Sequence, residues 1–219
     1  MNETLLLPNH MSCEACGLNR SRTYVVPGRG NTKSPLVFVG EAPGREEDQA
    51  GQPFIGKSGK LLREIIDAMP LMNSEDYFFT NTHHCRPPNN DTAQGEAAGW
   101  SICPKIWLTA ELQRIKPKVI IATGATACHY FRPEDTDMPM RWHVAKDTWL
   151  EDLKCWVVGA FHPSYVLRQG VNEGTREGNK ALVSLVASLQ RAMYYLMASG
   201  ICQTPEVPEI TEALETGAL

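Results

Sequence analysis

Four short runs of apolar, mostly β-branched residues place the strongest limit on the fold of this 219-residue chain. The apolar residues of each run are continuous and do not alternate with polar ones, which is typical of strands buried on both faces of a parallel sheet. The runs occupy residues 36–39, 77–80, 118–122 and 155–160. The sequence therefore predicts a central parallel sheet of four strands.

Apolar residues recur at helical spacing in the segments between and after these strands. The predicted helices cover residues 57–69, 93–115 and 179–198. In the second of them, Ile106, Leu108 and Leu112 are expected to point inward. Alternation of strands and helices indicates an α/β fold with helices on both faces of the sheet.

The length and the charge pattern suggest one globular domain followed by an acidic tail. Residues 1–200 form the predicted domain, and residues 201–219 contain four Glu and no Lys or Arg, as expected of a flexible segment. The net charge of −4 comes from this tail, since the acidic and basic residues of the remaining chain are equal in number. Charge therefore neither supports nor excludes a nucleic-acid partner.

The sequence predicts a cytoplasmic protein without a membrane partner, and we expect a monomer. No apolar run approaches the ~20 residues that span a bilayer, and residues 1–8 contain no basic residue that would begin a secretion signal. Seven cysteines in such a chain point to a metal or redox site more than to disulfides.

Small, polar and titratable residues follow each predicted strand, in segments 40–44, 81–85, 124–127 and 162–164. In open α/β sheets, ligands bind beyond the carboxyl ends of the parallel strands. The pattern therefore predicts one crevice to which all four segments contribute.

Three sequence motifs resemble those of the family 4 uracil-DNA glycosylases, which are iron–sulfur enzymes. They are GEAPGREED at residues 40–48, GQPFIG at 51–56 and HPSYVLR at 162–168. The resemblance extends from Cys13 to Leu196 and implies a three-layer αβα sandwich. It also implies base excision repair of DNA, in which the N-glycosidic bond of uracil is hydrolysed to leave an abasic site.

The resemblance also assigns four cysteines, Cys13, Cys16, Cys85 and Cys103, to a [4Fe–4S] cluster. Their spacing alone suits tetrahedral zinc equally well, so zinc is the alternative. The other three cysteines, Cys128, Cys155 and Cys202, are interpreted as incidental.

The family match implies that Phe54 stacks on a uracil flipped out of the DNA and that Asn81 reads its edge. An amide can donate to uracil O4 and accept from N3–H, whereas cytosine reverses both polarities. Without the family match, Phe54 could be a core residue and Asn81 a turn former.

The predicted catalytic residues are Glu41 and His162, and Gly40 and Ala42 complete the predicted substrate-binding set. His162 matches a histidine that stabilises charge on uracil O2 as the bond breaks. Glu41 is assigned to water or to the oxocarbenium-like sugar. Many related glycosylases have Asp where this chain has Ala42, so Glu47 and Asn89 are alternative general bases.

The segment 165–168 resembles a wedge that enters the minor groove of DNA, which assigns Tyr165, Leu167 and Arg168 to DNA binding. Lys57, Lys60 and Arg86 are candidates for phosphate contacts.

The chain departs from the family at His83 and His84, and Gly44 leaves room near the base's 5-position. Two rival functions therefore stay open: a glycosylase for another or a modified base, and a catalytically silent DNA-binding module with a structural metal.

Overall fold

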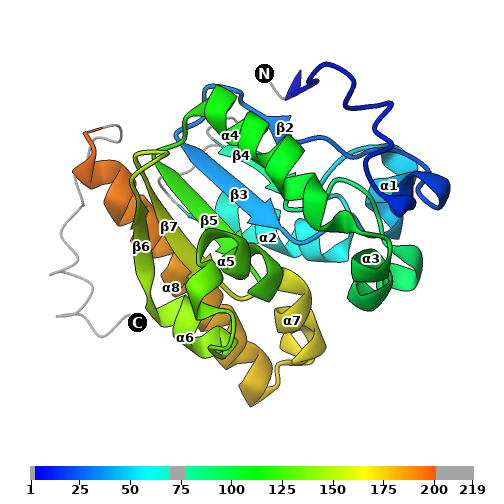
Figure 1. Ribbon diagram of the computed structural model, residues 1–219. Helices are drawn as coiled ribbons and strands as arrows, with labels where there is room; N and C mark the ends of the chain where they lie inside the picture. The colour runs from blue at the N-terminus through cyan, green and yellow to red at the C-terminus, as the bar shows by residue number, and fades with distance from the viewer. Residues whose placement is uncertain (1–2, 70–76, 201–219) are drawn as a thin grey trace, which may run out of the picture.

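The computed structural model describes residues 3–69 and 77–200, so the predicted acidic tail lies outside the described residues. Four parallel strands form the centre of its sheet (Figure 1). They lie in the order β4 (Tyr77–Asn81), β3 (Leu36–Gly40), β5 (Val119–Thr123) and β7 (Cys155–Ala160). The predicted parallel sheet is confirmed, with every strand within one residue of its expected bounds.

Three short antiparallel strands extend this sheet to seven strands, which the sequence analysis did not predict. β1 (Glu3–Thr4) and β2 (Arg29–Gly30) continue the edge beyond β4, and β6 (Asp147–Leu150) pairs with β7 at the opposite edge. Two-residue strands show no hydrophobic periodicity, so their sequences carry no strand signal.

Helices cover both faces of the sheet, and the α/β sandwich is confirmed (Figure 1). On one face, α2 (Lys57–Asp67) and α8 (Arg176–Ala198) pack apolar side chains against Phe38, Phe79 and Ile121. On the other face, α4 (Thr109–Ile115) and α5 (Ala125–Phe131) pack against Val37, Val39 and Ile120. Successive residues of each strand face opposite layers, which explains their continuous apolar runs.

The predicted helix over residues 93–115 is wrong, because the segment is broken into shorter pieces. It contains α3 (Thr92–Ala97), a 3-10 turn at Trp100–Ile102, a π-helical stretch at Pro104–Leu108 and then α4. Gly99 adopts a left-handed conformation with φ of 74°, and Pro104 cannot donate a backbone hydrogen bond. Ile106, predicted to point inward, is therefore exposed, whereas Leu108 and Leu112 are buried.

The remaining helices are short and border the carboxyl edge of the sheet. They are α1 (Arg45–Ala50), α6 (Met140–Ala145) and α7 (Pro163–Arg168). The predicted wedge, residues 165–168, lies in α7, and its Val166 is part of the core.

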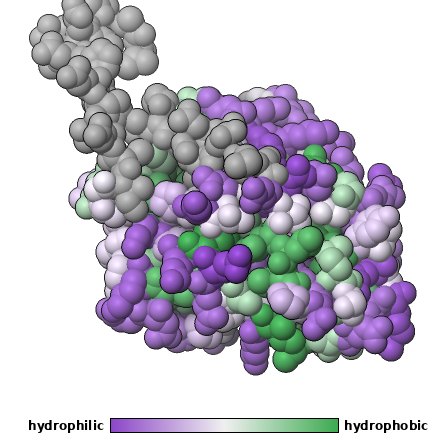
Figure 2. Space-filling view, turned by 90° about the horizontal axis from the view of Figure 1, so that it is seen from above, coloured by the Kyte–Doolittle hydropathy of each residue, from purple (hydrophilic) through white to green (hydrophobic). Residues whose placement is uncertain are grey.

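By length and composition alone, α8 could cross a membrane. In the fold it packs Leu185, Leu189 and Met193 against the sheet. On the face seen from above, hydrophilic residues surround a band of hydrophobic ones (Figure 2).

Candidate functional site

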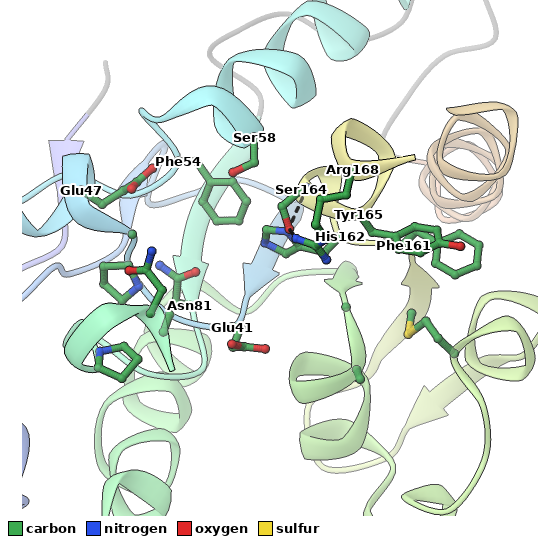
Figure 3. Close-up of a pocket in the computed structure, with 18 of the residues that line it drawn as sticks. Glu41, Glu47, Phe54, Ser58, Asn81, Phe161, His162, Ser164, Tyr165 and Arg168 are labelled. Atoms are coloured by element: carbon green, nitrogen blue, oxygen red, sulfur yellow. Dashed lines mark hydrogen bonds between the residues drawn. The ribbon is translucent and has the colours of Figure 1, made fainter. Parts of the chain in front are cut away.

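A pocket of about 820 Å³ opens at the carboxyl edge of the parallel strands. Its walls come from the segments that follow β3, β4, β5 and β7, and their side chains point towards one another (Figure 3). The pocket brings together five of the six predicted substrate-binding residues: Glu41, Ala42, Phe54, Asn81 and His162. Residues up to about 120 positions apart thus meet because parallel strands end at the same edge.

Gly40, the sixth predicted residue, lies directly beneath two pocket side chains. A Cβ atom at this position would overlap Asn81 Oδ1 and approach Phe54 Cζ to 2.8 Å. Glycine is therefore required here for close packing, so that Asn81 and Phe54 can sit against the end of β3. Gly40 shapes the pocket through its neighbours.

Asn81, the last residue of β4, is 3% exposed and places its side chain at the pocket wall (Figure 3). Among the described residues its amide has no hydrogen-bond partner within the protein. The amide faces the pocket and is not among the buried polar groups that lack a partner, so it is open to a ligand.

Phe54 packs on the protein with one face of its ring and lines the pocket as well. Its ring stacks on Phe79 with the centroids 4.9 Å apart. Its backbone has a φ of 56°, unusual for a residue with a side chain. Gly59 allows this turn, because a Cβ there would overlap the Phe54 carbonyl group. Strain of this kind is often found at functional sites.

Glu41 follows β3 directly and is held by a neighbour that the sequence analysis did not name. The hydroxyl of Thr126, in α5, donates to Glu41 Oε2 over 2.6 Å. This bond ties one carboxylate oxygen to the protein. The segment after β5 was expected at the crevice, but only the structure shows which of its residues contacts Glu41.

The two alternative general bases differ in position. Glu47 is buried and lines the pocket, and its Oε1 accepts a 2.7 Å hydrogen bond from the backbone N–H of Gly56. Asn89 is exposed and does not line the pocket, whereas its neighbour Asn90 does. Gly44 is also part of the lining, and a Cβ there would meet Glu47 Oε2 at 2.7 Å.

His162 is oriented by the turn that begins α7. The backbone N–H of Ser164 donates to His162 Nδ1 over 3.1 Å, so this nitrogen carries no proton. Burial, with a smaller contribution from the charge of Arg168, lowers the pKa of His162 to about 4. The neutral ring therefore carries its proton on Nε2, where it can donate to a ligand.

The predicted DNA-binding residues occupy different positions on α7. Tyr165 lines the pocket and stacks on Phe161, with the ring centroids 4.9 Å apart. Arg168 is exposed, also lines the pocket, and donates to Ser164 Oγ over 3.0 Å. Leu167 is half-buried and lies outside the lining.

A second, smaller cavity is lined by the four predicted metal ligands, Cys13, Cys16, Cys85 and Cys103. N–H groups point at three of these sulfurs: Trp107 Nε1 donates to Cys13 over 3.2 Å, the His84 backbone to Cys103 over 3.3 Å, and Arg22 Nη1 to Cys85 over 3.6 Å. Hydrogen bonds of this kind tune metal-bound thiolates.

His83 and His84 line the cysteine cavity and are not part of the larger pocket. Both are buried, and His83 stacks on Trp100 with the ring centroids 3.8 Å apart. The sequence analysis placed these two histidines beside the pocket. The structure separates them from it, because the chain turns away after Asn81.

Comparison with known proteins identifies the family of this chain. Type-4 uracil-DNA glycosylase from Thermotoga maritima is 41% identical over 74% of this chain and 81% of its own length. The proteins of the same name from Archaeoglobus fulgidus and Saccharolobus solfataricus are 39% and 34% identical, over 72% and 88% of this chain. The sequence pattern of the uracil DNA glycosylase superfamily matches residues 27–186. The chain belongs to the type-4 uracil-DNA glycosylases.

Family membership confirms the resemblance on which the sequence analysis relied. The superfamily match includes all the pocket residues named above, together with Cys85 and Cys103. Thr126, which binds Glu41, and Ser164, which lines the pocket, were not singled out from the sequence. Both lie in segments that follow parallel strands, and this position is the sequence signal that could have found them.

Proposed function

We propose that this type-4 uracil-DNA glycosylase family member hydrolyses the N-glycosidic bond of uracil in DNA and leaves an abasic site. The observation that carries the proposal is the convergence of Phe54, Asn81 and His162 on one pocket beside Glu41. Together they offer a stacking ring, a free amide, a neutral imidazole and a carboxylate. These are the groups needed to hold a flipped base and break its bond to the sugar.

Base recognition is assigned to Asn81. Its amide Nδ2 would donate to uracil O4 and its Oδ1 would accept from N3–H. Asn81 Oδ1 lies against Gly40 at the end of β3, where any larger residue would displace it. Cytosine would oppose both groups with the same polarity and is therefore rejected.

Stabilisation of the departing base is assigned to His162. Its Nε2–H would donate to uracil O2 as negative charge develops there. A neutral donor suits this role because it leaves the base as an anion and requires no proton transfer from the ring. Ser164 keeps the ring in this tautomer.

Glu41 would act on the sugar side of the bond. With Oε2 bound by Thr126, Oε1 is the oxygen available to orient a water molecule or face the positive sugar. Glu47 stays the alternative, since it also lines the pocket and has one oxygen bound, by the Gly56 N–H.

DNA binding is assigned to α7 and the start of α2. Tyr165 and Arg168 border the pocket, and Leu167 lies one turn away from Ser164 on the same helix. Lys57 and Lys60 are exposed on α2 and are suited to phosphate contacts. A single domain, a monomeric state and a cytoplasmic location stay predictions.

Cys13, Cys16, Cys85 and Cys103 would hold a [4Fe–4S] cluster, which would tie the N-terminal segment to the loops after β4. In the described chain, no three of these thiols are close enough together to form a donor group for a single ion. Tetrahedral zinc needs sulfurs roughly 3.8 Å apart, given zinc–sulfur bonds of about 2.3 Å. Burial raises the pKa of Cys85 to about 11, so its thiolate needs a positive centre nearby.

Replacement of Asn81 by Asp tests the function. The carboxylate keeps the size of the side chain but faces O4 with a lone pair, so uracil excision should fall about ten- to a hundredfold. Single-turnover excision from matched U:G and C:G duplexes measures the effect. Asn179→Asp, which adds the same charge on an exposed part of α8, should match wild type.

The same assay separates the rival functions when hypoxanthine and 5-modified bases are included. Cleavage of one of these in preference to uracil would indicate another base specificity, for which Gly44 leaves space. Failure of wild type to cleave any of them would favour a silent DNA-binding module. If Asn81→Asp cuts uracil as fast as wild type, Asn81 does not read the base.

A further inference from the structure

Two buried histidines, His10 and His84, form a contact that the proposed reaction does not use. Both side chains are fully buried, and His10 Nε2 lies 2.7 Å from His84 Nδ1. This contact engages one nitrogen of each ring, whereas the buried His10 Nδ1 has no partner among the described residues.

The direction of each hydrogen bond follows from the backbone of Asn81. His84 Nε2 lies 3.0 Å from the Asn81 carbonyl oxygen, which can only accept, so Nε2 carries a proton. In the neutral ring Nδ1 then lacks one and accepts from His10 Nε2–H. The chain of bonds runs from His10 through His84 to Asn81.

The neighbouring carboxylate leaves this chain of bonds intact. Glu111 is fully buried, and its Oε1 accepts from the Gly28 backbone over 2.8 Å. Its Oε2 accepts from Thr80 Oγ1 over 2.5 Å. Donor atoms of His10, His84 and Glu111 lie within 4.8 Å of one another, close enough for an ion. However, both carboxylate oxygens, His10 Nε2 and both His84 nitrogens are already hydrogen-bonded, which leaves only His10 Nδ1 of this group without a partner.

The same two histidines contact the cysteine segments. The His10 carbonyl accepts from the Cys13 backbone over 3.1 Å, and the His10 ring stacks on Trp107 at 4.2 Å. Trp107 in turn donates to Cys13 Sγ. The His84 backbone donates to Cys103 Sγ, while its ring holds Asn81.

We propose that His84 is a positioning residue for the base reader: it binds the Asn81 carbonyl from the cysteine side, and His10 fixes its orientation. The inference rests on the proposed function, because Asn81 matters here as the residue that reads uracil. β4 ends at Asn81, so the backbone there is no longer held by paired strands on both sides. The N-terminal cysteine segment, which carries His10, thereby helps to hold Asn81 in place for base recognition.

Two substitutions at His84 separate positioning from packing. His84→Gln places its amide nitrogen near the position of Nε2 and can still donate to the Asn81 carbonyl. His84→Asn is shorter, reaches the position of Nδ1 and loses that donor. Single-turnover uracil excision should be near wild type in His84→Gln and about ten- to a hundredfold slower in His84→Asn.

Three further measurements accompany the rates. The dissociation constant for uracil-containing DNA and the iron content per chain should stay the same in both variants. The ratio of uracil to cytosine excision should fall in His84→Asn and stay near wild type in His84→Gln. His10→Phe keeps a ring over Trp107 but removes the donor, so a smaller fall in the same ratio is expected.

The inference is overturned if His84→Asn and His84→Gln excise uracil equally fast, or if both lose iron together. It is also overturned if wild-type protein holds a zinc ion that His10→Phe loses, since His10 and His84 would then be metal ligands. A wild type without glycosylase activity would instead refute the proposed function, which separates the two failures.

Discussion

The pocket and the cysteine cavity lie on either side of the chain just after β4, yet they are built differently. In the pocket, the Asn81 amide and His162 Nε2 face open space and are not engaged by the described protein groups. In the cysteine cavity, N–H groups of Trp107, Arg22 and His84 already point at sulfur atoms.

The difference distinguishes a site for a transient ligand from a site for a resident one. Polar groups left without protein partners gain free energy when a ligand binds, which suits a substrate that arrives and leaves. Sulfurs surrounded by N–H donors and apolar side chains suit a group that stays bound. If this contrast is correct, substitutions in the cavity should alter metal content and those in the pocket should alter rates.

The largest expected effect is on metal content. Cys103→Ala should lose the cluster, whereas Cys155→Ala removes another buried cysteine, in β7, and should keep it. Anaerobically purified wild type should be brown and contain about four irons per chain. Elemental analysis showing one zinc and no iron in wild type would contradict the cluster assignment.

The next largest effect is on the chemical step. His162→Ala removes a donor to the developing anion and should slow single-turnover excision by ~10²–10³-fold with little change in DNA affinity. His162→Gln, which can still donate, should recover part of the rate. His129 lies in α5 outside the pocket lining, so His129→Ala should match wild type. An unchanged rate in His162→Ala would remove this residue from the mechanism.

The pH dependence of wild type sharpens this prediction. Burial first, and Arg168 second, lower the pKa of His162 to about 4, so the ring stays neutral above that pH. The rate should therefore show no step due to His162 in the ordinary range of imidazole, near pH 6.5. A rise in rate on acidification through that range, lost in His162→Gln, would indicate a cationic ring.

The smallest effect concerns the support of Glu41. Thr126→Val keeps the shape of the side chain but removes its hydroxyl. Glu41 then loses the hydrogen bond that orients it, which contributes about 1 kcal/mol. Single-turnover excision should fall roughly five- to tenfold. Thr126→Ser keeps the hydroxyl and should restore the rate; equal rates for the two variants would show that the bond is not used.

Much of the fold could be predicted from the sequence because its strands are buried on both faces. Continuous apolar runs predicted β3, β4, β5 and β7 and their common carboxyl edge. The helix predicted over residues 93–115 failed because helical periodicity outweighed Gly99 and Pro104 in the prediction. β1 and β2 were missed because two residues are too few to show a period, and β6 has only four.

The sequence by itself determined the sheet, the family and the residue types that meet at the strand ends. Only the tertiary structure decided which partner each of them has: Thr126 for Glu41, Ser164 for His162, and His84 for the Asn81 backbone. These contacts join segments that are distant in the chain or depend on the direction of a single ring. Hydrogen bonds depend on distances of a few tenths of an ångström, whereas sequence patterns record only which side chains face the core.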